Sequence, residues 1–402
     1  MRLRHIMRAA AILAAAALTT SCSDVVNYED DIEDIYSNSG APVITAIYDV
    51  KDTKLENALQ EGSLNQMIRI TGNNLAKAKS VTFNGIEVDV RSIYATTTAS
   101  YMKIPREIPE AVDNKIVYTT DRGTVTYDFR VNIPHMSCEG LANEFALPGE
   151  SVQVKGEFFD LFGFGDSESD ATITMTNEAE GYSKALEVDS LTEEYMGVLI
   201  PEDAPDNSVI TLTWTEPGNV AMQKTIPYRY TRYMMFDDLN TVGWWDGTPA
   251  TYITDGTADG DPETLGWDYF RFKGYFPQWQ WTQCGGGANW PDIDCTAAPA
   301  DYVFKFEVCN SASYPFYDSA EYGYLFSLNG GTNYPWNPSS GMSFNTYGEW
   351  KTISIPLDKV ASNGVPAPGT WSNFVLVMQP NTDGGWNVDH SFANFRIEPK
   401  DF

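Results

Sequence analysis

Apolar and polar side chains alternate in short runs along most of the chain, and turn-forming residues separate the runs. In SVTFNGIEVDV, residues 80–90, an Asn-Gly pair joins two alternating stretches, which is a strong signal for a β-hairpin. No sustained apolar pattern with the 3.6-residue period of a helix follows residue 20. Short alternating strands with turns about every eight to twelve residues predict an all-β protein built from sandwiches.

The first half of the chain contains an internal repeat with a period of about ninety residues. Its copies include YMKIPREIPEAVDNKIVYTT (101–120) and YMGVLIPEDAPDNSVITLTW (195–214). Each reads Tyr-Met, then Ile-Pro, Pro and Asp-Asn, and then an alternating strand. The repeat therefore predicts two tandem immunoglobulin-like sandwiches, over residues 41–133 and 134–231.

The remaining residues, 232–402, differ in composition, because ten of the eleven tryptophans lie after residue 235. Their strand candidates alternate or form short apolar runs, and none is followed by a helical pattern, so a parallel sheet is not expected. The candidates are residues 269–276, 302–309, 321–328, 350–357, 373–380 and 391–399. They predict a C-terminal jelly-roll-like β-sandwich.

The first 21 residues have the pattern of a secretion signal, with a basic start and a short apolar stretch that ends in small residues before Cys22. The sequence LTTSC resembles a bacterial lipoprotein signal, which implies lipidation of the Cys22 thiol; plain secretion with a chance cysteine is the alternative. Residues 22–40 are acidic and polar and predict an unfolded tether. Acids just after the cysteine resemble the surface-export signal of Bacteroidetes lipoproteins, which implies domains outside the cell.

Charge and composition narrow the choice of ligands. The net charge of −29 disfavours nucleic acid and anionic headgroups but tolerates neutral ligands. With three histidines and no Cys-x-x-Cys, neither a zinc site nor another cofactor is expected. Asp255, Asp259 and Asp261 do not have the spacing of an EF-hand, so a surface turn is expected there rather than a Ca²⁺ site. Whether Cys284 and Cys295 form a disulfide stays open.

Several tryptophans stand among prolines, glycines and polar residues, where core side chains are not expected. An exposed indole can stack on the C–H face of a sugar ring for about 1 kcal/mol, while nearby amides and carboxylates bind the hydroxyl groups. At least one of the adjacent Trp244 and Trp245 should be exposed. The candidate carbohydrate-binding residues are Trp244, Trp245, Asp246, Trp279, Trp281, Asn289, Trp290 and Trp336.

Two alternatives concern where these rings lie. The tryptophan-rich loops could instead pack on one another and seal one end of the sandwich. Trp350, Trp371 and Trp386 begin, precede or adjoin strand candidates, so we expect them in the core. Trp267 is left undecided.

The order of these parts resembles the surface glycan-binding lipoproteins of Bacteroidetes polysaccharide-utilisation systems. The resemblance rests on SCSD, on FDDLN followed by GWW, and on the stretches APVITAIYDV, IRITGNNL and VTFNGIEV, which are similar to IPT/TIG domains. It implies immunoglobulin-like spacers, a C-terminal glycan-binding sandwich and no catalytic activity. It also implies a lipid-anchored place on the outer membrane, beside a transporter and its paired glycan-binding lipoprotein.

The resemblance further implies that the binding aromatics lie on loops early in the last domain, which here are residues 244–245 and 279–290. Two spacers rather than three favour a β-1,3 or mixed-linkage β-glucan, and xyloglucan or another β-linked glycan stays open.

Two other functions stay open. A glycoside hydrolase needs two carboxylates about 5–9 Å apart, and pairs such as Asp292 with Asp294 or Glu307 with Glu321 occur, although we expect them to be solvated. A surface adhesin could use exposed aromatics to bind another protein.

Overall fold

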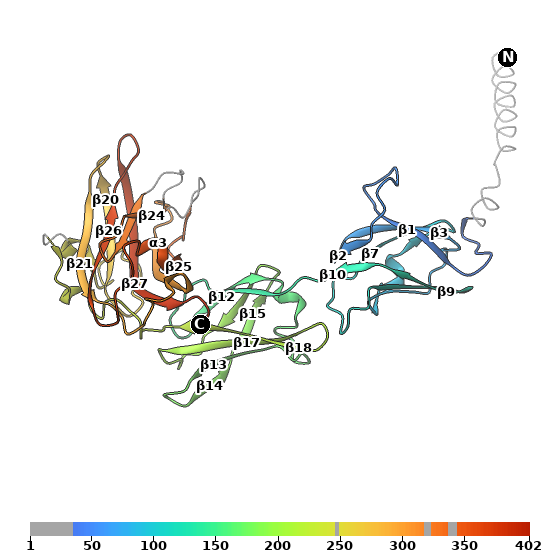
Figure 1. Cartoon of the computed structure of the whole chain (residues 1–402), viewed down its shortest axis with the longest axis horizontal. Helices are drawn as coiled ribbons and strands as arrows, with labels where there is room; N and C mark the ends of the chain where they lie inside the picture. Colours follow the sequence, from blue (N-terminus) through green and yellow to red (C-terminus); the bar gives the residue numbers. More distant parts are fainter. Residues whose placement is uncertain (1–34, 246–248, 317–322, 337–343) are drawn as a thin grey trace, which may run out of the picture. The chain divides into compact units, whose positions relative to one another are not determined.

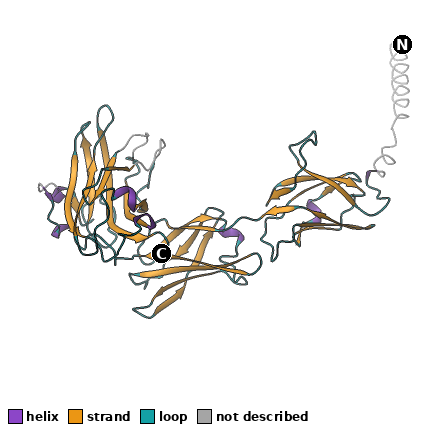
Figure 2. Ribbon diagram, viewed as in Figure 1, coloured by secondary structure: helices purple, strands orange, loops and turns teal. Residues whose placement is uncertain are grey.

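Alternating apolar and polar residues form strands, which make up most of the regular secondary structure of the computed structural model; it describes residues 35–245, 249–316, 323–336 and 344–402 (Figures 1 and 2). None of the helices in these ranges is long and apolar enough to cross a bilayer. They are α3 (Leu357–Val360), η1 (Val90–Ser92), η2 (Phe159–Leu161), η3 (Leu239–Thr241), η5 (Pro249–Thr251) and η6 (Pro299–Asp301). The predicted all-β class is confirmed.

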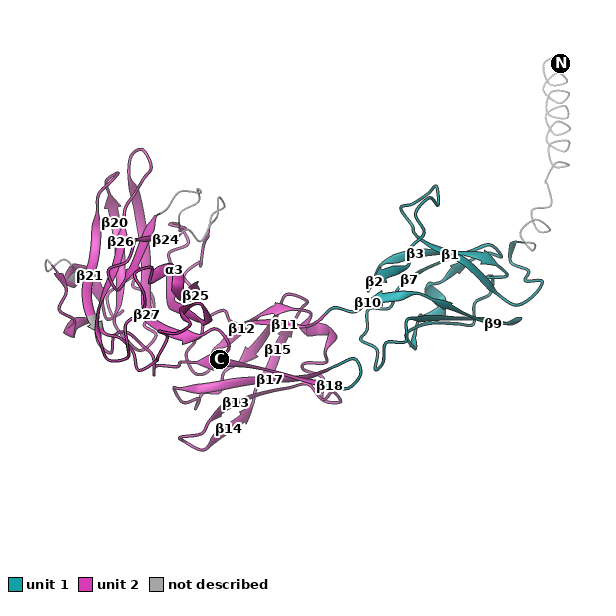
Figure 3. Ribbon diagram, viewed as in Figure 1, with its two compact units in different colours: residues 1–134, 216–220 teal, residues 135–215, 221–402 magenta. Residues whose placement is uncertain are grey.

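The chain divides into two compact units (Figure 3). One contains the chain up to Pro134 together with Glu216–Val220, and the other contains His135–Thr215 and Ala221–Phe402. The predicted division into a signal, a tether and three domains stays a prediction.

The first unit is a sandwich with one apolar core, to which Ile70, Met102 and Ile116 contribute from facing sheets. Its hairpin at Asn84 and Gly85, where φ is 47° and 82°, confirms the predicted Asn-Gly turn. One sheet holds β1 (Val43–Asp49), β3 (Met67–Asn73), β7 (Ala99–Lys103) and β6 (Tyr94–Ala95), and the other β5 (Ile86–Glu87), β4 (Ser80–Phe83), β8 (Lys115–Thr120) and β9 (Gly123–Asp128), with a parallel pair β10 (Arg130–Asn132) and β2 (Glu61–Ser63).

The second unit begins with another sandwich, whose buried residues alternate along the strands, as Val152 and Val154 do on one sheet and Ile210 and Leu212 on the other. The sheets are β11 (Ser137–Leu141), β12 (Ser151–Glu157), β16 (Tyr195–Leu199) and β15 (Glu187–Leu191), and β14 (Tyr182–Ala185), β13 (Thr172–Asn177), β17 (Ser208–Glu216) and β18 (Val220–Tyr228).

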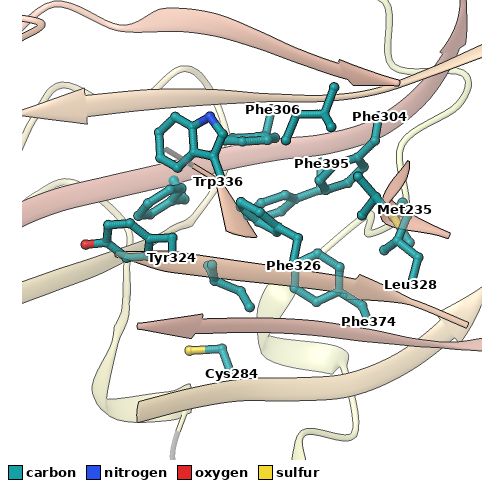
Figure 4. Packing of buried hydrophobic residues seen from close by; sticks show 14 of the residues in the cluster. Met235, Cys284, Phe304, Phe306, Tyr324, Phe326, Leu328, Trp336, Phe374 and Phe395 are labelled. Atoms are coloured by element: carbon teal, nitrogen blue, oxygen red, sulfur yellow. The ribbon is translucent and has the colours of Figure 1, made fainter. Parts of the chain in front are cut away.

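The C-terminal sandwich of the same unit encloses a core rich in phenylalanine, in which Phe306 lies 4.7 Å from Phe326 between ring centroids (Figure 4). We call its two layers the long sheet and the short sheet. The long sheet holds β19 (Ile253–Thr254), β20 (Tyr269–Phe276), β27 (Trp386–Pro399), β22 (Tyr302–Asn310) and β25 (Lys351–Pro356), and the short sheet β21 (Thr282–Asn289), β26 (Trp371–Met378), β23 (Tyr324–Leu328) and β24 (Tyr334–Trp336).

The outer face of the long sheet is covered in part by Phe145, which comes from the segment between β11 and β12. Its ring is fully buried in a cluster with Tyr269, Cys309 and Trp350. Trp267 meets the ring edge-on, with centroids 5.6 Å apart. The first sandwich of this unit, formed by β11 to β18, is therefore packed directly against the C-terminal one.

A buried ion network fixes this junction. Glu144 binds Lys305 at 2.6 Å and Arg396 at 2.6 Å, and Arg396 also binds Glu307 and Glu398, each at 2.9 Å. Breaking such a pair is costly, because it leaves a charge buried without its counter-ion.

A further part of the same face is covered by the chain's own segment 255–268. Arg271 is buried between Asp261 and Asp389, and the Trp350 indole N–H donates to the Glu263 carbonyl at 2.8 Å. The outer face of the long sheet is thus largely occupied, and the exposed indoles gather on the short sheet.

Candidate carbohydrate-binding site

The edge strand β21 carries three consecutive glycines, each of which makes room for an indole ring. A Cβ atom at Gly285 would lie 2.7 Å from Cε3 of Trp245, and a Cβ at Gly287 would come still closer to Trp371. Both glycines face away from the core, because side chains alternate along a strand and Cys284 points into it. Glycine lets the two rings lie against the strand itself.

Trp281 extends this row from the position just before β21. Its indole N–H donates to Oε1 of Gln283 at 2.9 Å, so the ring is held beside the outer face of the strand. Trp245, Trp281 and Trp371 are 37%, 47% and 58% exposed. We call these three rings the indole strip. From Gln283 to Asn289, the strand beneath it is about 20 Å long.

Neutral amide side chains lie beside the strip. The strand register places Gln283 and Asn289 on the outer face of β21, and Asn373 and Val375 on the adjoining face of β26. Asn289 is exposed, as its predicted role requires. Flat aromatic rings flanked by amides suit the C–H faces and hydroxyl groups of an uncharged sugar chain.

Trp279 is also exposed, by 57%. Its φ of 60° is unusual for a bulky residue, and its backbone N–H donates to the Pro380 carbonyl at 2.7 Å. Strained backbone of this kind occurs often at binding sites. The exposure expected of Trp279 and Trp281 agrees with the structure, whereas a sugar-binding role for either stays a proposal.

The exposure predicted for Trp290 and Trp336 is wrong. Trp290 is only 2% exposed, because it continues the inward alternation of Cys284 beyond the end of β21. Trp336 ends β24 with its ring in the core, edge-on to Phe306 at 5.4 Å (Figure 4), while the preceding Pro335 is exposed. Neither ring can receive a sugar.

Trp244 lies beneath β21 rather than on the strip. Its ring packs against Phe270, with centroids 5.2 Å apart, and its N–H donates to the Leu239 carbonyl at 2.8 Å. A Cβ at Gly286 would strike this ring from the core side of β21. The pair Trp244–Trp245 is therefore divided between core and surface, and Trp244 is removed from the candidate site. Asp246 lies outside the described residues.

The core position predicted for Trp371 is also wrong, and this ring is the one that the sequence argument missed. Trp371 starts β26 opposite Asn289, on the face away from the core. Gly287 was the available signal, because a glycine in a strand often marks a close approach. Trp350 is buried as predicted, and Trp386 and Trp267 are half-buried.

The cysteines that the sequence offered as a possible disulfide are buried, and two of the acids offered as a possible Ca²⁺ site have partners within the protein. Cys284 and Cys295 are buried free thiols, and burial raises the pKa of Cys295 to about 12. Asp255 accepts from the Thr257 backbone N–H at 3.0 Å, and Asp261 pairs with Arg271. The described ranges contain no group of three or more His, Cys, Asp or Glu side chains placed to hold a metal ion.

Two solved structures of surface glycan-binding proteins are distantly similar to the chain. The surface glycan-binding protein PbSGBP-B of Prevotella bryantii is 18% identical, covering 90% of this chain and 100% of that one, with a TM-score of 0.48. An SGBP-B from a complex xyloglucan utilization locus of Bacteroides uniformis is 19% identical, covering 89% and 99%, with a TM-score of 0.46. Since both TM-scores are below 0.5, neither likeness helps to assign a ligand.

Comparison with protein families is more specific. No curated protein matches the chain significantly. Residues 228–399, somewhat less than half of the chain, match the model of a family described as the surface glycan-binding protein B xyloglucan binding domain. The resemblance to surface glycan-binding proteins is thereby confirmed for the part of the chain that carries the indole strip.

Proposed function

We propose that this protein is a non-catalytic, cell-surface polysaccharide-binding protein that captures a β-glucan on the indole strip. The observation that carries the proposal is that Trp245, Trp281 and Trp371 lie in a row along β21. Gly285 and Gly287, which have no side chains, make room for two of these rings. Each stacked ring contributes about 1 kcal/mol. Useful affinity therefore needs several rings along one chain, which favours a polysaccharide over a small sugar.

Within this proposal, the first candidate ligand is a β-1,3 or mixed-linkage β-glucan, because the sequence predicts two immunoglobulin-like spacers rather than three. Xyloglucan is the second candidate, because the matching family model describes a xyloglucan binding domain. Lipidation at Cys22, a place on the outer membrane, and a partnership with a transporter and its paired lipoprotein belong to the same proposal. Cys22 lies outside the described residues.

The absence of catalysis is part of the proposal and is supported by where the acids lie. Glu307 binds Arg396 and accepts from the Thr352 hydroxyl inside the buried junction. Asp294 accepts from the Thr296 backbone N–H at 3.0 Å; Glu321 lies outside the described residues. Release of reducing ends from β-glucan by the pure protein would favour a hydrolase instead.

The proposal is tested by calorimetric titration of the full chain with mixed-linkage β-glucan, β-1,3-glucan and xyloglucan. The parent should bind a β-glucan, and Trp281→Ala should weaken binding about fivefold or more, since one stack is lost. Tyr347→Ala, which removes another exposed ring of the same sandwich, should bind like the parent. Binding to none of the three glycans would favour a protein-binding adhesin.

A further inference from the structure

We infer that Gln283 is a specificity-determining donor of the site, whose side-chain NH₂ group binds a backbone oxygen of the glycan between the rings of Trp281 and Trp245. The inference rests on the proposed function and adds a polar requirement to the stacking surface.

The orientation of the Gln283 amide follows from its bond to Trp281. An indole nitrogen can only donate a hydrogen bond, so the atom that accepts from it at 2.9 Å must be the amide oxygen. The assignment of oxygen and nitrogen, often ambiguous for glutamine, is thus fixed by chemistry. The NH₂ group points the other way.

The position of that NH₂ group is given by Gly285. A Cβ at this glycine would lie 2.6 Å from Nε2 of Gln283 and 2.7 Å from Cε3 of Trp245. Nε2 therefore lies over the glycine, next to the Trp245 ring and on the side away from Trp281. Within the described residues, Nε2 donates to no protein acceptor, so its two N–H groups are available to a ligand.

This arrangement selects a class of ligand. A sugar chain that stacks on both rings passes directly over Nε2, and its hydroxyl or ring oxygens can accept. An apolar chain would leave the NH₂ group without water and without a partner, which is unfavourable. The site should therefore prefer an extended glycan whose backbone oxygens are free on the side that faces β21, and reject one substituted there by a bulky group.

The decisive variant is Gln283→Glu. Its carboxylate keeps an acceptor for the Trp281 indole but loses both donors, whereas Gln283→Met loses the acceptor as well. The same amide-to-acid change at Gln153, an exposed residue of β12, is the matched control. All variants are made in the full chain, and their melting temperatures are compared with that of the parent.

If Gln283 donates to the glycan, Gln283→Glu should weaken binding to the preferred β-glucan about tenfold, and Gln283→Met at least as much, while Gln153→Glu binds like the parent. If Gln283→Glu binds like the parent and Gln283→Met does not, Gln283 only holds Trp281 and the inference is overturned. It is also overturned if both bind normally. Failure of the proposed function gives a different result, because Trp281→Ala would then also have no effect.

Discussion

At the scale of single residues, the face of the strand on which a tryptophan lies decides whether its ring is exposed or buried. Trp371 and Trp290 lie close together in space, since the Trp290 backbone N–H donates to the Thr370 carbonyl at 2.8 Å. Yet Trp371 faces solvent and Trp290 faces the core. Position relative to the sheet, rather than turn-forming neighbours in the sequence, determines which of the two rings is exposed.

The glycines of β21 give a test that changes none of the side chains proposed to contact the sugar. Gly287→Ala should displace Trp371 and weaken β-glucan binding about fivefold to tenfold, which corresponds to one lost stack. Gly285→Ala should weaken binding at least as much, because its Cβ displaces both the Trp245 ring and the Gln283 amide. Titration calorimetry measures the change. Gly243→Ala is the control, because a Cβ there meets no atom within 4 Å. Unchanged binding by both β21 variants would show that the rings need no such support.

Trp290 gives the opposite expectation. Trp290→Ala should lower the free energy of unfolding by about 3–5 kcal/mol, as expected for a large core ring replaced by alanine. Glycan affinity, measured below the melting transition, should remain near that of the parent. Denaturation curves and calorimetry together distinguish this result from a loss of binding without destabilisation, which would place Trp290 in the site after all.

At the scale of elements, alternation in the sequence predicted the strands that have apolar inner faces. Residues 269–276 form β20 as expected, and the Asn-Gly hairpin pairs β4 with β5. The strand β21 was less visible, because glycine has low strand propensity and no side chain to alternate. The exposed position of Trp371 depends on its register against β21, and register is a property of paired strands that one strand's sequence does not reveal.

The same limit applies to the junction between the two sandwiches of the second unit. Phe145 stands outside the strands, in a segment whose sequence does not indicate that it enters a neighbouring sandwich. Its burial depends on Tyr269 and Trp350, more than a hundred residues away in the chain. Long-range contacts of this kind could not be predicted from local pattern.

At the scale of the whole molecule, the sandwich before the C-terminal one buries side chains against it, and this contact should stabilise the sandwich that carries the strip. An isolated fragment 232–402 lacks Phe145 and Glu144, so it exposes the apolar cluster around Trp350 and loses a counter-ion of Arg396. Its melting temperature should be about 5 °C or more below that of a fragment 135–402. Thermal melts of the two fragments test this, and equal melting temperatures would contradict a stabilising junction.

The junction should also make stability depend on pH. Burial raises the pKa of Glu307 to about 7, although Arg396 opposes the shift. Because this value lies above that of the unfolded chain, about 4.5, the Glu307 contribution is fully present below pH 4.5 and is lost as the pH rises through 7. Glu144 makes stability change with pH in the opposite direction. Burial raises its pKa, but Lys305 and Arg396 outweigh burial and lower it, so the Glu144 contribution to stability is lost as the pH falls.

Comparison of the parent with Glu307→Gln isolates the first effect. The unfolding free energy of the parent relative to this variant should fall by up to about 3 kcal/mol between pH 4.5 and pH 7.5. Urea denaturation at several pH values gives this difference, and Glu202→Gln, an exposed position, serves as the control. A difference that does not vary with pH would mean that Glu307 ionises normally.

The central claim is that the outer face of β21 and β26 is where a glycan binds, and Trp371 tests it most directly because only the fold places this ring there. Calorimetric titration of mixed-linkage β-glucan into the parent and into Trp371→Ala should show binding weakened about fivefold or more, with an unchanged melting temperature. Equal affinity of the two proteins for every glycan that the parent binds would contradict the account.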